Sequence, residues 1–181
     1  MDISLFVNMT SRAWSLPILA RLHDGVPGRQ APLLAATGAS RTAFAQSMEH
    51  LIQIGLLERN PGHGHPLRPE FRLTQIGIRA AALAHKINRI TQDEDTALLR
   101  RSWTLPVLAA LYEPRHFNDI RRGLGRITDR ALSQSLRAME DRCWVSRRIN
   151  DAARPPRALY TAINTGQLIS QAAAVDIRFN A

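Results

Sequence analysis

The sequence RSWTLPVLA at residues 101–109 repeats an earlier stretch, RAWSLPILA at residues 12–20, with Trp103 in the place of Trp14. Three further matches follow in the same order, at a spacing of 88 or 89 residues. They pair FAQSMEHL (44–51) with LSQSLRAM (132–139), LLER (56–59) with WVSR (144–147), and FRLTQIG (71–77) with YTAINTG (160–166). A preserved order at a nearly constant spacing indicates that one unit occurs twice in the chain.

This repeat predicts two small domains of similar size. A chain of 181 residues is long enough for two domains of about 80–90 residues each. We expect a first unit at residues 1–90, a linker or connecting helix at 91–99, and a second unit at 100–181. The acidic stretch TQDED (91–95) marks the boundary. Because it lacks glycine and proline, we expect a semi-rigid connection, one form of which is a helix that continues between the units.

The charge balance favours a polyanionic partner. The chain has 24 basic against 15 acidic residues, a formal net charge of +9, and this excess favours nucleic acid. A single cysteine excludes an intramolecular disulfide and a cysteine-based zinc cluster. The start MDISLFVNMT lacks the basic region of a signal peptide, and no apolar run is long enough to span a membrane. We therefore expect a cytoplasmic, nucleoid-associated protein with no membrane partner.

The second unit has the element pattern of a winged helix. Its apolar spacing predicts an opening helix, a helix-turn-helix, a two-stranded ribbon and a closing helix. The expected helices cover 101–113, 116–124, 128–141 and the residues from 164 onward, and the expected strands cover 144–149 and 158–162. The first unit repeats this plan, so the predicted fold class is mainly α with small β-ribbons (α+β), arranged as tandem winged helix-turn-helix domains.

Candidate DNA-binding residues of the second unit follow from this pattern. The second helix of a helix-turn-helix lies in the major groove, where arginine pairs with guanine and glutamine with adenine. Thr128 caps that helix, and the free backbone amides of the first turn can bind a phosphate. Arginines in the ribbon loop reach phosphates or the minor groove. The candidates are Thr128, Arg130, Ser133, Gln134 and Arg137 on the helix, and Arg154 and Arg157 on the loop.

The corresponding face of the first unit differs in its chemistry. Glu49 stands where the second unit has Arg137, and Thr42 stands where it has Arg130. An acidic side chain is repelled by phosphates, although it can accept a hydrogen bond from cytosine. The two units are therefore not expected to read the same base sequence. The candidates here are Ser40, Arg41, Thr42 and Gln46 on the helix, and His63, His65 and Arg68 on the loop.

Four segments of the second unit occur in a fixed order: RSWTLPVLAAL (101–111), RHFNDIRRGL (115–124), TDRALSQSLRAMED (128–141) and PPRALYTAINTG (155–166). In this order and at this spacing they resemble the HxlR-type (MarR-like) winged helix regulators of bacteria. The resemblance extends to the first unit through RAWSLPILARL (12–22). It implies a transcription factor, usually dimeric through its first and last helices. Both units lack the cysteine that the family carries before its first helix. Cys143 replaces a common glycine, and we expect it to be a small buried residue.

Three hypotheses about function remain open. In the first, the chain is a monomer whose units form an internal pseudo-dimer on double-stranded DNA. In the second, only the second unit reads DNA, and the first docks a partner or forms a homodimer. In the third, the protein is an adaptor for RNA polymerase or another protein. No catalytic motif occurs, and the pair His63 and His65 is a weak metal site, so we expect neither an enzyme nor a cofactor nor a metal.

Overall fold

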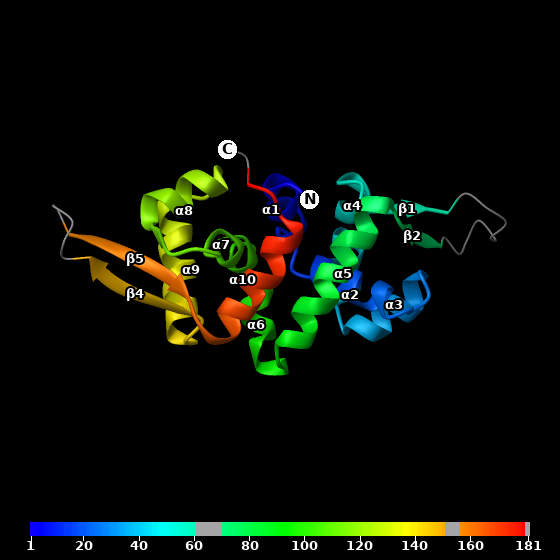
Figure 1. The fold of residues 1–181 in the computed structure, drawn as a ribbon. Helices are drawn as coiled ribbons and strands as arrows, with labels where there is room; N and C mark the ends of the chain where they lie inside the picture. The colour runs from blue at the N-terminus through cyan, green and yellow to red at the C-terminus, as the bar shows by residue number, and fades with distance from the viewer. Residues whose placement is uncertain (61–69, 151–155, 180–181) are drawn as a thin grey trace.

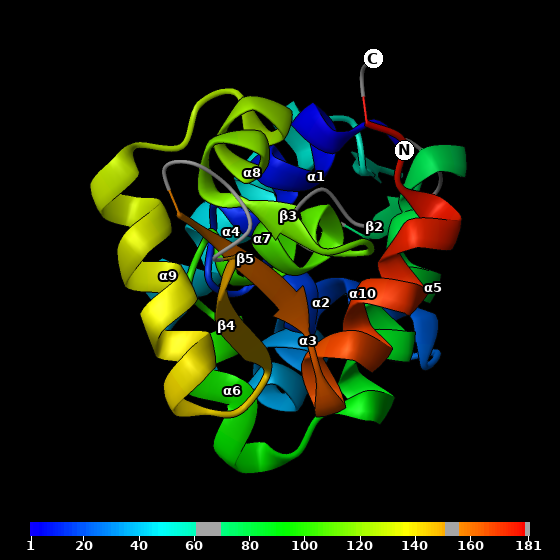
Figure 2. The same ribbon diagram turned by 60° about the vertical axis from the view of Figure 1, so that its left-hand side comes forward.

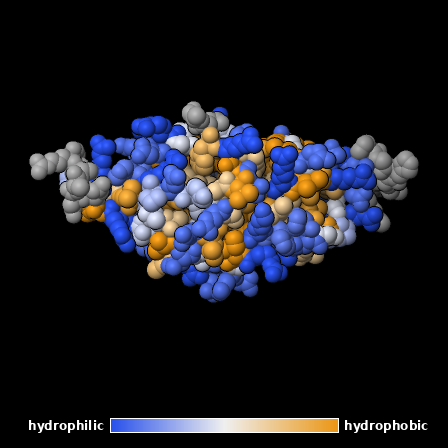
Figure 3. Space-filling view, viewed as in Figure 1, coloured by the Kyte–Doolittle hydropathy of each residue, from blue (hydrophilic) through white to orange (hydrophobic). Residues whose placement is uncertain are grey.

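The computed structural model describes residues 1–60, 70–150 and 156–179. Most of these residues are helical, and the strands form two small antiparallel sheets. The molecule is elongated (Figures 1 and 3), with one ribbon at each end and the helices between them. The predicted fold class, mainly α with small β-ribbons, is therefore confirmed.

One order of elements occurs twice along the chain. We call α2–α5 the first unit and α7–α10 the second unit. The first contains α2 (Ser15–His23), α3 (Gln30–Thr37), α4 (Arg41–Gln53), β1 (Leu57–Arg59), β2 (Phe71–Leu73) and α5 (Gln75–Ile90). The second contains α7 (Thr104–Ala110), α8 (Phe117–Leu124), α9 (Asp129–Asp141), β4 (Val145–Asn150), β5 (Arg157–Ala162) and α10 (Asn164–Asp176). These bounds lie within a few residues of those expected from periodicity and capping.

Two short elements were not expected from the sequence, α1 (Ile3–Thr10) and β3 (Arg115–His116). The linker itself contains η1 (Asp93–Asp95) and α6 (Thr96–Leu99). The helix of the first unit does not continue through the linker, because Thr91 and Gln92 adopt extended conformations after the end of α5. The connection is instead a 3-10 turn followed directly by one turn of α-helix.

The strands pair in the antiparallel register of a winged helix. In the first unit Leu57 lies opposite Leu73, and in the second Val145 lies opposite Ala162. The second sheet gains β3 as a third strand, in the order β3-β5-β4. An isolated bridge between Arg29 and Glu70 holds the segment before α3 to the segment before β2 in the first unit.

Two equivalent glycines bring the last helix of each unit against its ribbon. A Cβ on Gly77 would overlap the carbonyl oxygen of Leu56, and a Cβ on Gly166 would overlap that of Trp144. The same carbonyls accept hydrogen bonds from the backbone of Thr74 and Ile163, at 3.1 and 2.8 Å. The close approach therefore requires glycine at both positions, and both units show the same contact and the same hydrogen bond.

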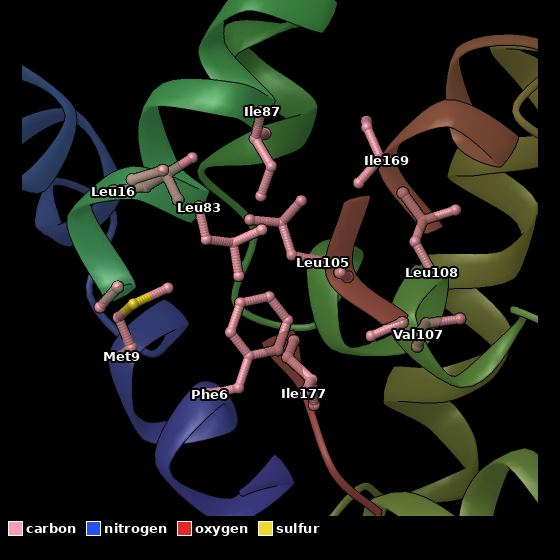
Figure 4. Packing of buried hydrophobic residues seen from close by; sticks show 14 of the residues in the cluster. Phe6, Met9, Leu16, Leu83, Ile87, Leu105, Val107, Leu108, Ile169 and Ile177 are labelled. Carbon is pink, nitrogen blue, oxygen red and sulfur yellow. The ribbon is translucent and has the colours of Figure 1, made fainter. Parts of the chain in front are cut away.

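The apolar core extends from one unit into the other. Phe6 and Met9 of α1 are fully buried, although α1 precedes the first unit, and α1 packs against α7 and α8 of the second. Figure 4 shows Phe6 among Leu83, Leu105 and Ile177, which come from both halves of the chain. Helices α5 and α10 also pack on each other. The two units therefore share one core.

Polar contacts reinforce this junction. The Thr10 hydroxyl donates to the Ser102 carbonyl at 2.9 Å, and the Arg100 guanidinium lies 3.8 Å from the centre of the Trp14 ring. Lys86 of α5 forms an ion pair of 3.6 Å with Asp176. These contacts fix the relative position of the two units through several independent elements.

Candidate nucleic-acid interface

Helix α9 presents its predicted DNA-facing residues to solvent. Its N-cap, Thr128, accepts a hydrogen bond from the backbone N–H of Ala131 at 3.2 Å, and this leaves the other amides of the first turn directed outward. The opposite side of the helix is anchored in the core by Leu132, Leu136 and Met139. The exposed residues of the helix include Arg130, Ser133, Gln134 and Arg137.

The two candidate arginines of α9 are unpaired with any described acidic residue. Within residues 1–60, 70–150 and 156–179, neither Arg130 nor Arg137 forms an ion pair. Arg121 of α8, by contrast, pairs with Asp129 in the first turn of α9 at 3.2 Å. An unpaired guanidinium keeps all its donors for a ligand, and a planar fork of donors fits both phosphate and a guanine edge.

Helix α4 has the same frame and a different outer face. Its N-cap Ser40 accepts from the backbone N–H of Ala43 at 3.3 Å, which matches the geometry at the start of α9. Phe44, Met48 and Leu51 bury the inner side of the helix. The exposed residues are Arg41, Thr42, Ala45, Gln46, Glu49 and Gln53. The positive charge of this helix therefore lies at its first residue alone.

The two helices lie on one side of the molecule. In Figure 1 the helices α5 and α10 are in front, and α4 lies behind α5. In the turned view of Figure 2, α9 and α4 lie toward one side, and α5 and α10 lie toward the other.

Only part of the predicted ribbon residues can be located. His63, His65, Arg68 and Arg154 lie outside the described residues. Arg157 is exposed at the start of β5, in register with Asn150 of β4.

Three arginines near this surface were missed from the sequence. Arg147 and Arg148 are adjacent on β4 and both are exposed, and Arg126 is exposed in the turn between α8 and α9. A ribbon that packs on a core shows one exposed face, so strand alternation alone favours only one of two adjacent arginines. The signal that could have found them is the charged run SRRIN (146–150), which lacks alternation.

The end of α9 is held by a cluster of opposite charges. Arg142, its C-cap, donates from Nε to Asp95 at 2.9 Å, and its terminal nitrogen lies 2.7 Å from Asp95 and 3.2 Å from Glu94. The hydrogen bonds to Asp95 and Glu94 raise the pKa of the Arg142 guanidinium above its usual value. The next residue, Cys143, has a φ of 57° and is exposed, so the expectation of a buried cysteine was wrong.

Metal and membrane signals are weak in the described part of the chain. His85 lies 2.6 Å from Asp24 and its ring stacks near that of His23, but no group of three or more candidate ligands occurs among the described residues. No described helix is both long and apolar enough to cross a membrane.

Comparison with known proteins places a family domain in the second unit. Residues 98–175 match the model of the HxlR-like helix-turn-helix family. The chain is 34% identical over 73 residues to an "Uncharacterized HTH-type transcriptional regulator YtfH" of Escherichia coli (strain K12), and equally to the protein of that name from Shigella flexneri. The alignment covers 40% of this chain and 57% of each relative, so the chain spans little more than half the length of the curated relatives it matches. No solved structure matches the chain.

These matches place an HxlR-like helix-turn-helix domain at residues 98–175. The matched range begins in α6 and ends in α10, and it therefore contains α8, α9 and the ribbon. The first unit lies outside this range.

Proposed function

We propose that this protein is a sequence-specific regulator that binds double-stranded DNA through two unequal winged helix domains in one chain. The domains would cover residues 1–90, which add α1 to the first unit, and residues 100–181, joined by residues 91–99. The observation that carries the proposal is the outer face of α9, where Arg130 and Arg137 have no described ion-pair partner. The helix-turn-helix match to residues 98–175 supports the same reading.

The arrangement of the units supports an internal pseudo-dimer. Helix α5 packs on α10, and α1 packs on α7. Dimeric winged helix proteins place two recognition helices about one turn of DNA apart, roughly 34 Å, on one face of the duplex. Because α4 and α9 lie on one side of this molecule, a single chain would meet two successive stretches of the major groove.

The unequal faces predict an asymmetric DNA site. Arg130 and Arg137 favour guanine on the half-site read by α9, while Gln46 and Thr42 offer neutral contacts through α4. Arg147 and Arg148 of the ribbon, with Arg157, would bind phosphates and add affinity without sequence preference.

This proposal is tested by selecting bound fragments from random DNA and then footprinting the protein on the most strongly selected sequence. One chain per site, two protected patches about 10 base pairs apart and unequal half-sites are expected. Affinity should fall steeply with salt, since each neutralised phosphate adds about 0.9 to the slope of log affinity against log salt. A perfectly palindromic site occupied by two chains would contradict the pseudo-dimer, and weak, salt-insensitive binding would contradict DNA reading altogether.

A second candidate function is that only the second unit contacts DNA and the first docks a protein partner, such as RNA polymerase. The observation that favours it is Glu49, which stands on α4 where α9 carries Arg137. Footprinting separates the two, because protection of a single half-site by one chain is expected only in this second case.

A further inference from the structure

A cluster of charges connects the linker between the units to the end of α9. Asp95 lies in η1, directly after the first unit, and its side chain is only 6% exposed. One of its carboxylate oxygens receives Arg142, and the other accepts from the backbone N–H of Gln92 at 3.0 Å. Glu94 adds a third, more exposed contact to the same guanidinium. Both oxygens of the buried carboxylate are thus engaged, so its position is well defined.

The linker end of this cluster is continuous with the first unit. Gln92 follows two residues after the end of α5, and α5 packs along α2, the central helix of the first unit. On the other side, the Thr104 hydroxyl donates to the Leu98 carbonyl at 2.7 Å and fixes α6 to the start of α7. A contact from α9 to η1 therefore fixes the position of α9 relative to the first unit as well as within the second unit.

Helix α4 lacks this contact and has another in its place. The residue equivalent to Arg142 in the repeat is Ile54, which is also the C-cap of its helix. Instead, the imidazole of His50 lies 2.7 Å from the carbonyl oxygen of Asn8 and 3.2 Å from the hydroxyl of Ser11, at the end of α1. Each recognition helix is thus joined near its C-terminal end to the segment that precedes its own unit.

We infer that Arg142 is a positioning residue that holds α9 at a fixed distance and angle from α4, and thereby sets the spacing of the two DNA half-sites. The inference rests on the proposed function for its DNA consequence only. Two guanidinium nitrogens converge on one oxygen of Asp95, and one of them also contacts Glu94, so the contact defines direction as well as distance. A buried carboxylate that loses its partner is costly to leave in place. Loss of Arg142 should therefore free the end of α9 while the buried apolar side of the helix stays packed.

A distance measurement tests the positional part without DNA. Spin labels at Gln53→Cys on α4 and Arg137→Cys on α9, in a Cys143→Gly background, report the separation of the two helices by pulsed electron resonance. The glycine suits the positive φ at this position. A single narrow distance is expected for this labelled protein, and a clearly broader or shifted distribution after Arg142→Gln. An unchanged distribution would overturn the inference, whether or not the protein binds DNA.

Matched variants separate positioning from general loss of stability. Arg21→Gln removes an ion pair with Asp24 that lies inside the first unit, and it should leave the distance distribution narrow. Arg142→Lys keeps one charged donor and should restore part of the narrow distribution. Equal broadening by Arg21→Gln would mean that any lost ion pair has this effect, and it would overturn a specific role for Arg142.

Half-site spacing tests the DNA consequence. Five added base pairs place the second half-site on the opposite face of the duplex, since one helical turn is about 10 base pairs. Each protein is compared on the lengthened site and on the original site. The unmodified protein should bind the lengthened site at least about tenfold more weakly. The Arg142→Gln variant binds the original site more weakly to begin with, and it should lose less than about threefold on the lengthened site. Equal losses in both proteins would overturn the inference about spacing. If the unmodified protein binds no DNA, the proposed function fails, and the distance measurement still decides the role of Arg142.

Discussion

Helices α4 and α9 begin alike and differ in what they present. Each starts at a hydroxyl N-cap that accepts from the third residue of the helix, and each buries a matching set of core residues. Their outer faces differ in charge, because Arg130 and Arg137 on α9 correspond to Thr42 and Glu49 on α4. Packing thus constrains the buried side of α4 and α9 and leaves the exposed side free to differ.

The largest expected effect tests whether the two units share their stability. Gly77→Ala and Gly166→Ala should each cost about 2–3 kcal/mol, since the added methyl group overlaps a backbone carbonyl that cannot move independently. Because the core is continuous, either variant should lower a single thermal unfolding transition, followed by circular dichroism or calorimetry. Two separate transitions, with only one shifted, would show that the units fold independently.

Gly123→Ala in α8 is the matched control for this pair. The nearest atoms to its added methyl group lie at 3.8 Å, an ordinary contact distance. Alanine is favoured over glycine within a helix by up to about 1 kcal/mol, so this variant should unfold at the same or a higher temperature.

The next effect measures the functional difference between the helices. The double variant Arg130→Ala, Arg137→Ala should weaken DNA binding by at least about 30-fold, since each of the two bidentate base contacts contributes at least about 1 kcal/mol. Gln46→Ala on α4 should cost less, about threefold to tenfold. Fluorescence anisotropy titrations at one salt concentration provide the measurement. An equal loss of DNA affinity from variants of both helices would contradict the proposed asymmetry. No loss of affinity from Gln46→Ala would favour the hypothesis that only the second unit binds DNA.

A smaller effect tests the similarity of the two helix starts. Ser40→Ala and Thr128→Ala should each lower the free energy of unfolding by about 1 kcal/mol, because each removes one cap to the third amide of its helix. Urea titration measures both. Ser133→Ala, at an exposed site within α9, should leave stability within about 0.5 kcal/mol of the parent and serves as the control. A marked difference between the two caps would mean that the helix starts are not equivalent.

The smallest effect changes the charge difference directly. Glu49→Arg gives α4 the charge that Arg137 gives α9, and it should raise DNA affinity by less than about tenfold. The slope of log affinity against log salt should steepen by about 0.9, the value for one further phosphate contact. Glu113→Arg, an exposed position beside α10 and not on a recognition helix or ribbon, is the charge-matched control. An identical gain from both would indicate a general charge effect, not a contact made by α4.

Local signals predicted most of the fold. Residue type and the apolar pattern that follows it predict Thr128 as an N-cap, and Thr128 accepts the expected hydrogen bond. Ser40 and Thr74 accept the same kind of hydrogen bond at the starts of α4 and α5. Such features depend on residues close in sequence. The HxlR-like part of the predicted resemblance is likewise confirmed for residues 98–175, where four segments of the motif occur in order.

Features that depend on distant residues were not predicted. Helix α1 is short and apolar, and its partners on α7 lie about a hundred residues away, so nothing local indicates its role. Leu168 and Val175 are apolar residues of α10, yet they are 54% and 79% exposed because α10 packs on α5 and α7 through its other faces. The contact of Arg142 with Asp95 joins residues 47 apart and has no sequence signature. The DNA-binding role of the candidate residues stays a prediction.

The placement of Phe6 between the units has a consequence for how the protein behaves on dilution. Two separate subunits dissociate when their concentration falls below their dissociation constant, and they can exchange with related subunits. Here the same kind of contact forms within one molecule, so its strength is set by chain geometry and not by the amount of protein. Under the proposed pseudo-dimer, the two helices would therefore keep their relative position even at a few copies of the protein per cell.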